Sequence, residues 1–267
     1  MKFYLEQSFE EVKHDPKIVK QLLNEYKVVV LKDYKLEKAS VDYFNELADQ
    51  LGYIYPMDED LETGIATGKR WIDITYDPKF PNRYRSAPVA QPLHTDASYI
   101  DIKENVQFIY CAGAAKYGGA TTFIDSRKIV DFLEIAGESQ LLKALQETPI
   151  LFSKDNRKRT SPILRKDGED WRFNWNYFCG DKNNSEEHKD LFNRFHNFLE
   201  TRVVKSGLVT EAHLNKYNVV FWHDELVLHG RNSYFATTPG ERTLYKGTIV
   251  FEEHYDKNKH LDLKKYV

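Results

Sequence analysis

The segment Gln91-Pro92-Leu93-His94-Thr95-Asp96 carries a histidine and a carboxylate two residues apart. Because side chains at positions i and i+2 of a strand point to the same face, His94 and Asp96 could hold one metal ion together. The segment Leu228-His229-Gly230-Arg231, far downstream, supplies a second histidine. Two histidines and one carboxylate on one face of a metal are typical of non-haem iron(II) sites, which keep the remaining positions open for a cosubstrate.

The spacing His-x-acid is common in this chain and is not diagnostic by itself. It occurs five times, beginning at His94, His188, His223, His254 and His260. The pair at His188 lies in a segment with helical periodicity, and residues i and i+2 of a helix do not face each other. The last two pairs lie in the charged run 252–265, which is typical of a solvated tail or helix. The pair of His223 and Glu225, close to His229, is the strongest competing interpretation.

The bulk properties limit the class of protein and its partners. The chain has 267 residues and a formal net charge of −3, with both signs mixed along the sequence. This length predicts one domain spanning residues 1–267. The mixed charge argues against nucleic acid or a membrane as partner, so a small-molecule substrate is expected, and a homo-oligomer is compatible with the sequence. Cys111 and Cys179 are too few for a disulfide framework, and residues 1–6 hold no apolar leader, so a cytoplasmic location is expected.

The hydrophobic pattern predicts many short strands with helices gathered on one side. Helices are predicted at 17–26, 40–51, 126–145 and 186–204. Strands are predicted at 27–31, 71–76, 106–112, 120–124, 148–152, 162–165, 171–178, 219–222 and 242–251. Residues 77–92, with four prolines, are predicted to form a loop that covers a site. This order favours a mainly β fold with flanking helices, a double-stranded β-helix or jelly roll, over a parallel α/β sheet.

Further motifs surround the two histidine segments. They are Lys27-Val28-Val29-Val30-Leu31, Leu51-Gly52-Tyr53, Gly118-Gly119-Ala120-Thr121 and Glu241-Arg242-Thr243-Leu244-Tyr245-Lys246. Together with the histidine segments they resemble the taurine dioxygenase-like (TauD/TfdA) family of iron(II)/2-oxoglutarate-dependent oxygenases. The order and the spacings of these motifs over most of the chain carry the resemblance.

The resemblance implies roles for five residues. His94, Asp96 and His229 would be the catalytic metal ligands that hold Fe(2+), at which O2 reacts. Arg242 would pair with the C5 carboxylate of the cosubstrate 2-oxoglutarate, since a planar guanidinium matches a carboxylate with two parallel hydrogen bonds. Thr121 would contact the same carboxylate.

Two more residues are expected at the substrate. Lys246 stands where taurine dioxygenase has the arginine that grips the sulfonate, so a cationic group is kept although taurine itself is not expected. It lies four positions after Arg242 and therefore on the same strand face. Tyr99, three residues after Asp96, is expected to line the pocket. The expected reaction is oxidation, most simply hydroxylation, of an unactivated C–H bond of a small anionic molecule, with release of succinate and CO2. An amino acid, a small acid or a natural-product intermediate would fit.

Two other functions are compatible with a jelly roll. A non-catalytic small-molecule sensor could use the same fold, because fold does not determine function. Such a protein is expected to lack a metal ligand or the cosubstrate anchor, whereas the sequence retains both. A metal-dependent jelly-roll enzyme that does not use 2-oxoglutarate would have no use for Arg242 and Thr121 as a matched pair.

Overall fold

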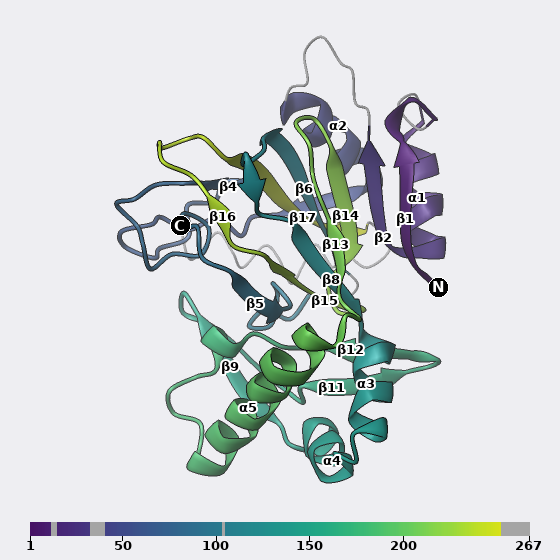
Figure 1. The fold of residues 1–267 in the computed structure, drawn as a ribbon, viewed down its shortest axis with the longest axis vertical. Helices are drawn as coiled ribbons and strands as arrows, with labels where there is room; N and C mark the ends of the chain where they lie inside the picture. Colours follow the sequence, from purple (N-terminus) through teal and green to yellow (C-terminus); the bar gives the residue numbers. More distant parts are fainter. Residues whose placement is uncertain (12–14, 33–40, 103–104, 252–267) are drawn as a thin grey trace.

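Two β-sheets form the centre of the computed structural model, which describes residues 1–11, 15–32, 41–102 and 105–251 (Figure 1). The larger sheet has the order β1-β2-β14-β6-β17-β3, with β4 paired to β17. Its strands are β1 (Lys2–Ser8), β2 (Tyr26–Lys32), β3 (Gly52–Tyr55), β4 (Ile72–Thr75), β6 (Asn105–Gly113), β14 (Val219–His223) and β17 (Thr243–Phe251). The smaller sheet has the order β13-β8-β15-β5, formed by β5 (Gln91–His94), β8 (Thr121–Asp125), β13 (Thr210–Ala212) and β15 (Val227–Arg231).

The two sheets pack against each other through apolar side chains from both. This shared core contains Val28, Val30, Ile109, Cys111, Phe123, Ala212, Val220, Trp222, Val227 and Leu244. Apart from the parallel pair β1–β2, the described pairings within both sheets are antiparallel. Two antiparallel sheets with crossovers and a shared core form a jelly roll, so the predicted fold class is confirmed.

Strand β2 explains why a run of β-branched residues becomes a central strand. Val28 and Val30 face the smaller sheet, whereas Val29 and Leu31 belong to a second cluster with helices α1 (Pro16–Glu25) and α2 (Val41–Leu51). Because both faces of the strand are covered, the apolar run is continuous and does not alternate.

A third group of elements packs on the other side of the smaller sheet (Figure 1). Its helices are α3 (Ser126–Ile135), α4 (Ser139–Glu147) and α5 (Glu186–Phe198), the last continued by a π-helical turn at Leu199–Val203 and a 3-10 turn at Val204–Ser206. Its hairpins are β9 (Ile150–Lys154) with β10 (Arg157–Ser161), and β11 (Leu164–Asp167) with β12 (Asp170–Phe173). Short pieces elsewhere are β7 (Tyr117–Gly118), β16 (Tyr234–Phe235) and 3-10 turns at Phe9–Glu11 and Tyr177–Cys179.

Three predicted boundaries differ from the structure for local reasons. The helix predicted at 126–145 is divided, because Gly137 adopts a left-handed φ of 73° between α3 and α4. The strand predicted at 171–178 ends at Phe173, and Asn176 then caps a 3-10 turn by accepting a hydrogen bond from the backbone N–H of Phe178. The predicted loop 77–92 gives way to strand β5 at Gln91, and strands β1, β3, β10 and β13 were not predicted.

Some of the predicted features fall outside the residues that the structure describes. The competing pairs that begin at His254 and His260 lie outside the described residues, as does Ser40, the first residue of the second predicted helix. Within the described ranges, every helix is too short or too polar to cross a bilayer.

Candidate active site

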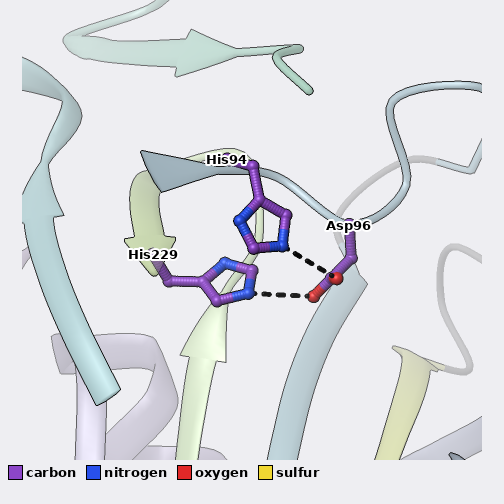
Figure 2. Close-up of side chains that lie close together, drawn as sticks. All are labelled: His94, Asp96 and His229. Atoms are coloured by element: carbon purple, nitrogen blue, oxygen red, sulfur yellow. Dashed lines mark ion pairs between the residues drawn. The ribbon is translucent and has the colours of Figure 1, made fainter. Parts of the chain in front are cut away.

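The pairing of β5 with β15 places two histidines side by side. His94 is the direct antiparallel partner of His229, and their ring centroids are 4.2 Å apart (Figure 2). The register then shifts toward Arg231, which pairs with Gln91 across an irregularity that includes Pro92. Because proline has no N–H to donate to the ladder, it is found in strands at irregularities of this kind.

The proton on His94 is fixed by its backbone. The Nδ1 atom lies 2.9 Å from the carbonyl oxygen of Pro92, which can only accept a hydrogen bond. Nδ1 therefore donates, and Nε2 keeps the lone pair that a metal needs. In the structure, the side-chain amide of Gln91 lies 3.1 Å from this Nε2 atom.

Asp96 reaches both imidazoles although it is not in the strand. Strand β5 ends at His94, so strand alternation does not align Asp96 with His94, and this reason for the predicted pairing is wrong. Asp96 Oδ1 nevertheless lies 3.5 Å from Nε2 of His94, and Oδ2 lies 3.3 Å from Nε2 of His229. Among the described residues, these three are the group of histidine, cysteine and acidic side chains whose ligand atoms converge, all within 4.8 Å of one another.

The protonation states of this cluster suit a metal cation. Burial, reinforced by the neighbouring His94, lowers the pKa of His229 well below its ordinary value. Burial opposes ionisation of Asp96, but Lys246 and then His229 outweigh it and hold the pKa of the carboxyl well below its ordinary value. Neutral imidazole and ionised carboxylate are the forms that bind a metal, so the donor set fits iron(II).

The competing pair of His223 and Glu225 does not converge. His223 Nε2 lies 2.7 Å from the carbonyl oxygen of Leu23 in α1. The Glu225 carboxylate instead forms ion pairs with three arginines of the β9–β12 region, Arg159, Arg165 and Arg172. These two side chains therefore take part in packing between elements and not in the histidine cluster.

Arg242 lies just before β17, behind the Gly118-Gly119 turn. It is 3% exposed, its guanidinium stacks 4.8 Å from the ring of Tyr234, and its Nη1 atom has no hydrogen-bond partner among the described residues. Gly119 has a φ of 75°, and a Cβ there would lie 3.2 Å from Nε of Arg242. A glycine is therefore required on both conformational and steric grounds, and the buried, unpaired guanidinium nitrogen fits an anionic ligand.

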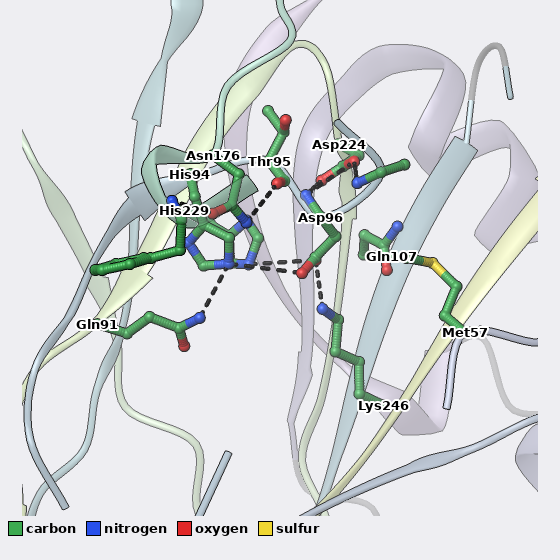
Figure 3. Close-up of polar contacts among 12 residues, drawn as sticks. Met57, Gln91, His94, Thr95, Asp96, Gln107, Asn176, Asp224, His229 and Lys246 are labelled. Carbon is green, nitrogen blue, oxygen red and sulfur yellow. Dashed lines mark hydrogen bonds and ion pairs between the residues drawn. The ribbon is translucent and has the colours of Figure 1, made fainter. Parts of the chain in front are cut away.

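The remaining predicted residues line the same cavity, which has a volume of about 750 Å³. Thr121, Arg242, Lys246 and Tyr99 all contribute to its wall together with the three candidate metal ligands. Lys246 is buried, and its ammonium forms an ion pair with Oδ2 of Asp96 (Figure 3). Burial raises the pKa of the Tyr99 phenol well above its ordinary value. A cavity of this size is in the range that holds small ligands.

Two positions that support the site were not predicted. Trp175 donates its indole N–H to the carbonyl oxygen of Leu93, and its backbone N–H donates to Thr95 Oγ1. Asp224 accepts hydrogen bonds from the backbone at Asp96. These contacts join residues that lie 80 to 128 positions apart in the sequence, and no local sequence pattern reports such a pairing.

Arg231 fastens the loop over the cavity to β15. Its guanidinium donates to the carbonyl oxygens of Tyr84 and Ala87, each at 2.8 Å, and to that of Val89. Burial, followed by the charge of Arg242, lowers its pKa to about 10. The predicted loop 77–92 thus covers the cavity because a buried arginine holds its backbone.

The sequence and the fold were compared with known proteins. The sequence profile described as "Taurine catabolism dioxygenase TauD, TfdA family" matches residues 5–248. No curated protein sequence matches this chain. Solved structures with the same fold include PvcB from Pseudomonas aeruginosa (TM-score 0.65, 14% identity, 96% of this chain and 91% of that one). An asparagine oxygenase in complex with Fe(II), 3-hydroxyasparagine and succinate gives a TM-score of 0.69 at 12% identity, covering 91% of this chain and 80% of that one.

A third similar structure is the non-haem iron oxygenase OrfP with Fe and alpha-ketoglutaric acid, with a TM-score of 0.66 at 14% identity over 95% of this chain and 82% of that one. The fold and the histidine–carboxylate cluster define an iron(II)/2-oxoglutarate-dependent oxygenase. The chain belongs to the TauD, TfdA family of dioxygenases. The predicted family, enzyme class and cofactors, iron(II) and 2-oxoglutarate, are thereby confirmed.

The contacts of Arg231 predict that the loop depends on this one side chain. We expect Arg231→Lys to destabilise the protein by about 1–3 kcal/mol, because an ammonium cannot serve three carbonyl oxygens and leaves buried acceptors unpaired. Urea unfolding measures this loss, and hydrogen–deuterium exchange should show the largest acceleration in residues 83–90. Arg127→Lys, at an exposed arginine, is the control and should change neither. Unchanged exchange at 83–90 in Arg231→Lys would contradict the assignment.

Proposed function

We propose that this enzyme oxidises, most simply by hydroxylation, an unactivated C–H bond of a small anionic molecule, with an amino acid as the best-supported class. The observation that carries the proposal is the convergence of His94, Asp96 and His229 in one cavity with Arg242, whose Nη1 atom has no hydrogen-bond partner among the described residues. The solved complexes with hydroxylated asparagine and hydroxylated arginine support the amino-acid class. The retained ligands and anchor do not favour a non-catalytic sensor or an enzyme that omits 2-oxoglutarate.

The cluster of two histidines and one carboxylate would hold iron(II). When bound, iron and 2-oxoglutarate supply the oxidising chemistry, in which O2 is consumed and succinate and CO2 are released. His94 contributes an imidazole whose orientation is fixed by the Pro92 carbonyl, and His229 contributes one kept neutral by burial. Asp96 contributes the negative charge that partly balances the cation.

Arg242 and Thr121 would bind the distal carboxylate of 2-oxoglutarate. The carboxylate would pair with the guanidinium nitrogen that has no partner among the described residues, and the Thr121 hydroxyl lines the same cavity. The ring of Tyr234 and the Gly119 carbonyl oxygen, which accepts a hydrogen bond from Nη2, support this orientation of Arg242. Arg242 is buried, and burial strengthens a charge pairing.

Lys246 and Tyr99 would contact the substrate. In the structure Asp96 is the anionic partner that makes the burial of Lys246 tolerable. With iron(II) bound, Asp96 would attract Lys246 less strongly, and the Lys246 ammonium could then pair with a substrate carboxylate. We further propose that residues 1–267 act as one domain in the cytoplasm, as a monomer or a homo-oligomer.

The first prediction separates the two candidate distal histidines. We expect anaerobic iron(II)-loaded wild-type protein and His223→Ala to develop the weak visible charge-transfer band on addition of 2-oxoglutarate. His229→Ala and Asp96→Ala should lose turnover and bind iron(II) much more weakly, because each removes one of three ligands. Visible spectroscopy and iron titration measure both effects. If His223→Ala and not His229→Ala lost the band, the distal ligand would be wrongly assigned.

The second prediction concerns the cosubstrate anchor. Removal of one partner of a buried charge pair costs about 2–5 kcal/mol. Arg242→Gln should therefore raise the apparent KM for 2-oxoglutarate by at least about tenfold while changing the KM of the main substrate much less. Steady-state kinetics with each reactant varied in turn measures the split. An unchanged KM for 2-oxoglutarate would mean that another residue, with Lys246 as the first candidate, anchors it.

The third prediction concerns substrate recognition. A screen of amino acids and small acids for succinate release identifies a substrate, and Lys246→Met should then raise its KM while sparing the uncoupled decarboxylation of 2-oxoglutarate. Iron(II) affinity is measured on the same variant, because Lys246 also contacts Asp96. A Lys246→Met enzyme with an unaltered substrate KM would remove Lys246 from the substrate site.

A further inference from the structure

A buried carboxylate lies behind the candidate metal ligand Asp96. Asp224, in the turn between β14 and β15, is fully buried, and both of its oxygens accept hydrogen bonds from backbone amides (Figure 3). The N–H of Asp96 lies 2.9 Å from Oδ1 and 3.1 Å from Oδ2, and the N–H of Ala97 lies 3.0 Å from Oδ2. The two segments are 128 residues apart in the sequence at their closest contact.

The backbone N–H groups of Asp96 and Ala97 do not pair with a neighbouring strand. Strand β5 ends at His94, so the ladder that pairs His94 with His229 does not extend to Asp96. Thr95 is held separately, through hydrogen bonds with the backbone of Trp175. Without an acceptor, the buried N–H groups of Asp96 and Ala97 would be left unpaired. Asp224 supplies that acceptor where the sheet no longer can.

A comparison with the next residue shows that this arrangement is particular to Asp224. Glu225 is also buried, but it forms ion pairs with arginines of neighbouring elements, as expected for a carboxylate that ties a fold together. The carboxylate oxygens of Asp224 accept hydrogen bonds from the backbone of a candidate metal ligand and of the residue after it. Because burying an acidic side chain is costly, the hydrogen bonds that its oxygens accept from these amides help to keep it in place.

We propose that Asp224 is a positioning residue that sets the backbone at Asp96 and so aims its carboxylate at the iron. The proposal rests on the iron site proposed above. Asp224 lies five residues before His229, so one β14–β15 connection delivers the distal histidine and fixes the carboxylate ligand. A shift of this connection would therefore displace two of the three ligands together.

The test compares Asp224→Ala and Asp224→Asn with Glu225→Gln, a matched change at the adjacent buried acid. Loss of a group that orients a metal ligand weakens metal binding by about 10–100-fold. Asp224→Ala should lose iron(II) affinity to this extent in an anaerobic competition titration. Asp224→Asn keeps one acceptor oxygen and should weaken affinity toward the lower end of that range. Glu225→Gln should lower the Tm of the metal-free protein and leave iron(II) affinity unchanged.

The outcomes separate a failure of this proposal from a failure of the iron site. The positioning role is overturned if Asp224→Ala binds iron(II) with wild-type affinity. It is also overturned if Glu225→Gln loses as much iron(II) affinity as Asp224→Ala when the two variants have the same Tm. If the alanine variant does not fold, wild-type affinity in Asp224→Asn overturns it instead. His229→Ala is titrated alongside: if that variant also binds iron(II) normally, the metal site itself is wrong, whereas loss in His229→Ala alone refutes only the role of Asp224.

Discussion

The antiparallel register that makes His94 and His229 direct partners is the constraint on which the rest of the site depends. A slip of one residue would turn one of these side chains to the opposite face of the sheet. The register is secured on both sides of the pair. Gly230 leaves no room for a side chain, since a Cβ there would lie 2.7 Å from the carbonyl oxygen of Gln91. On the other edge of β15, Phe123 of β8 is the partner of His229.

Three buried basic side chains line the cavity that holds the candidate metal ligands. Arg231, Arg242 and Lys246 are all buried and line the cavity, while Asp96 is the acidic side chain among the candidate metal ligands. Arg231 is stabilised by backbone carbonyls and Lys246 by Asp96, while Nε of Arg231 and Nη1 of Arg242 have no partner among the described residues. A site that adds a divalent metal to this set needs anionic ligands. A dicarboxylate cosubstrate and an anionic substrate meet that electrostatic requirement.

Sequence patterns predicted what local rules determine. The continuous apolar run of β2 and the paired histidine segments follow from strand periodicity and residue type, and both appear as expected. The patterns failed where a distant segment decides. The position of Asp96 depends on Asp224 across 128 residues, not on strand alternation, and the partner of Lys246 is a residue that follows a strand of the other sheet. Gly137 could have indicated the break between α3 and α4, because glycine favours the left-handed conformation that ends a helix.

The site lies where three packed groups meet, and this explains why no single element contains it. The smaller sheet supplies the two histidines and Thr121, and the larger sheet supplies Lys246. The helical group holds the segment between them, because Trp175 packs 4.7 Å from Phe195 of α5 and also clamps the backbone around Thr95. Packing of the helical core is therefore coupled directly to the geometry of the ligands. A substitution in α5, far from the cavity, can reach Asp96 through Trp175 and Thr95 without touching any group that binds metal or substrate.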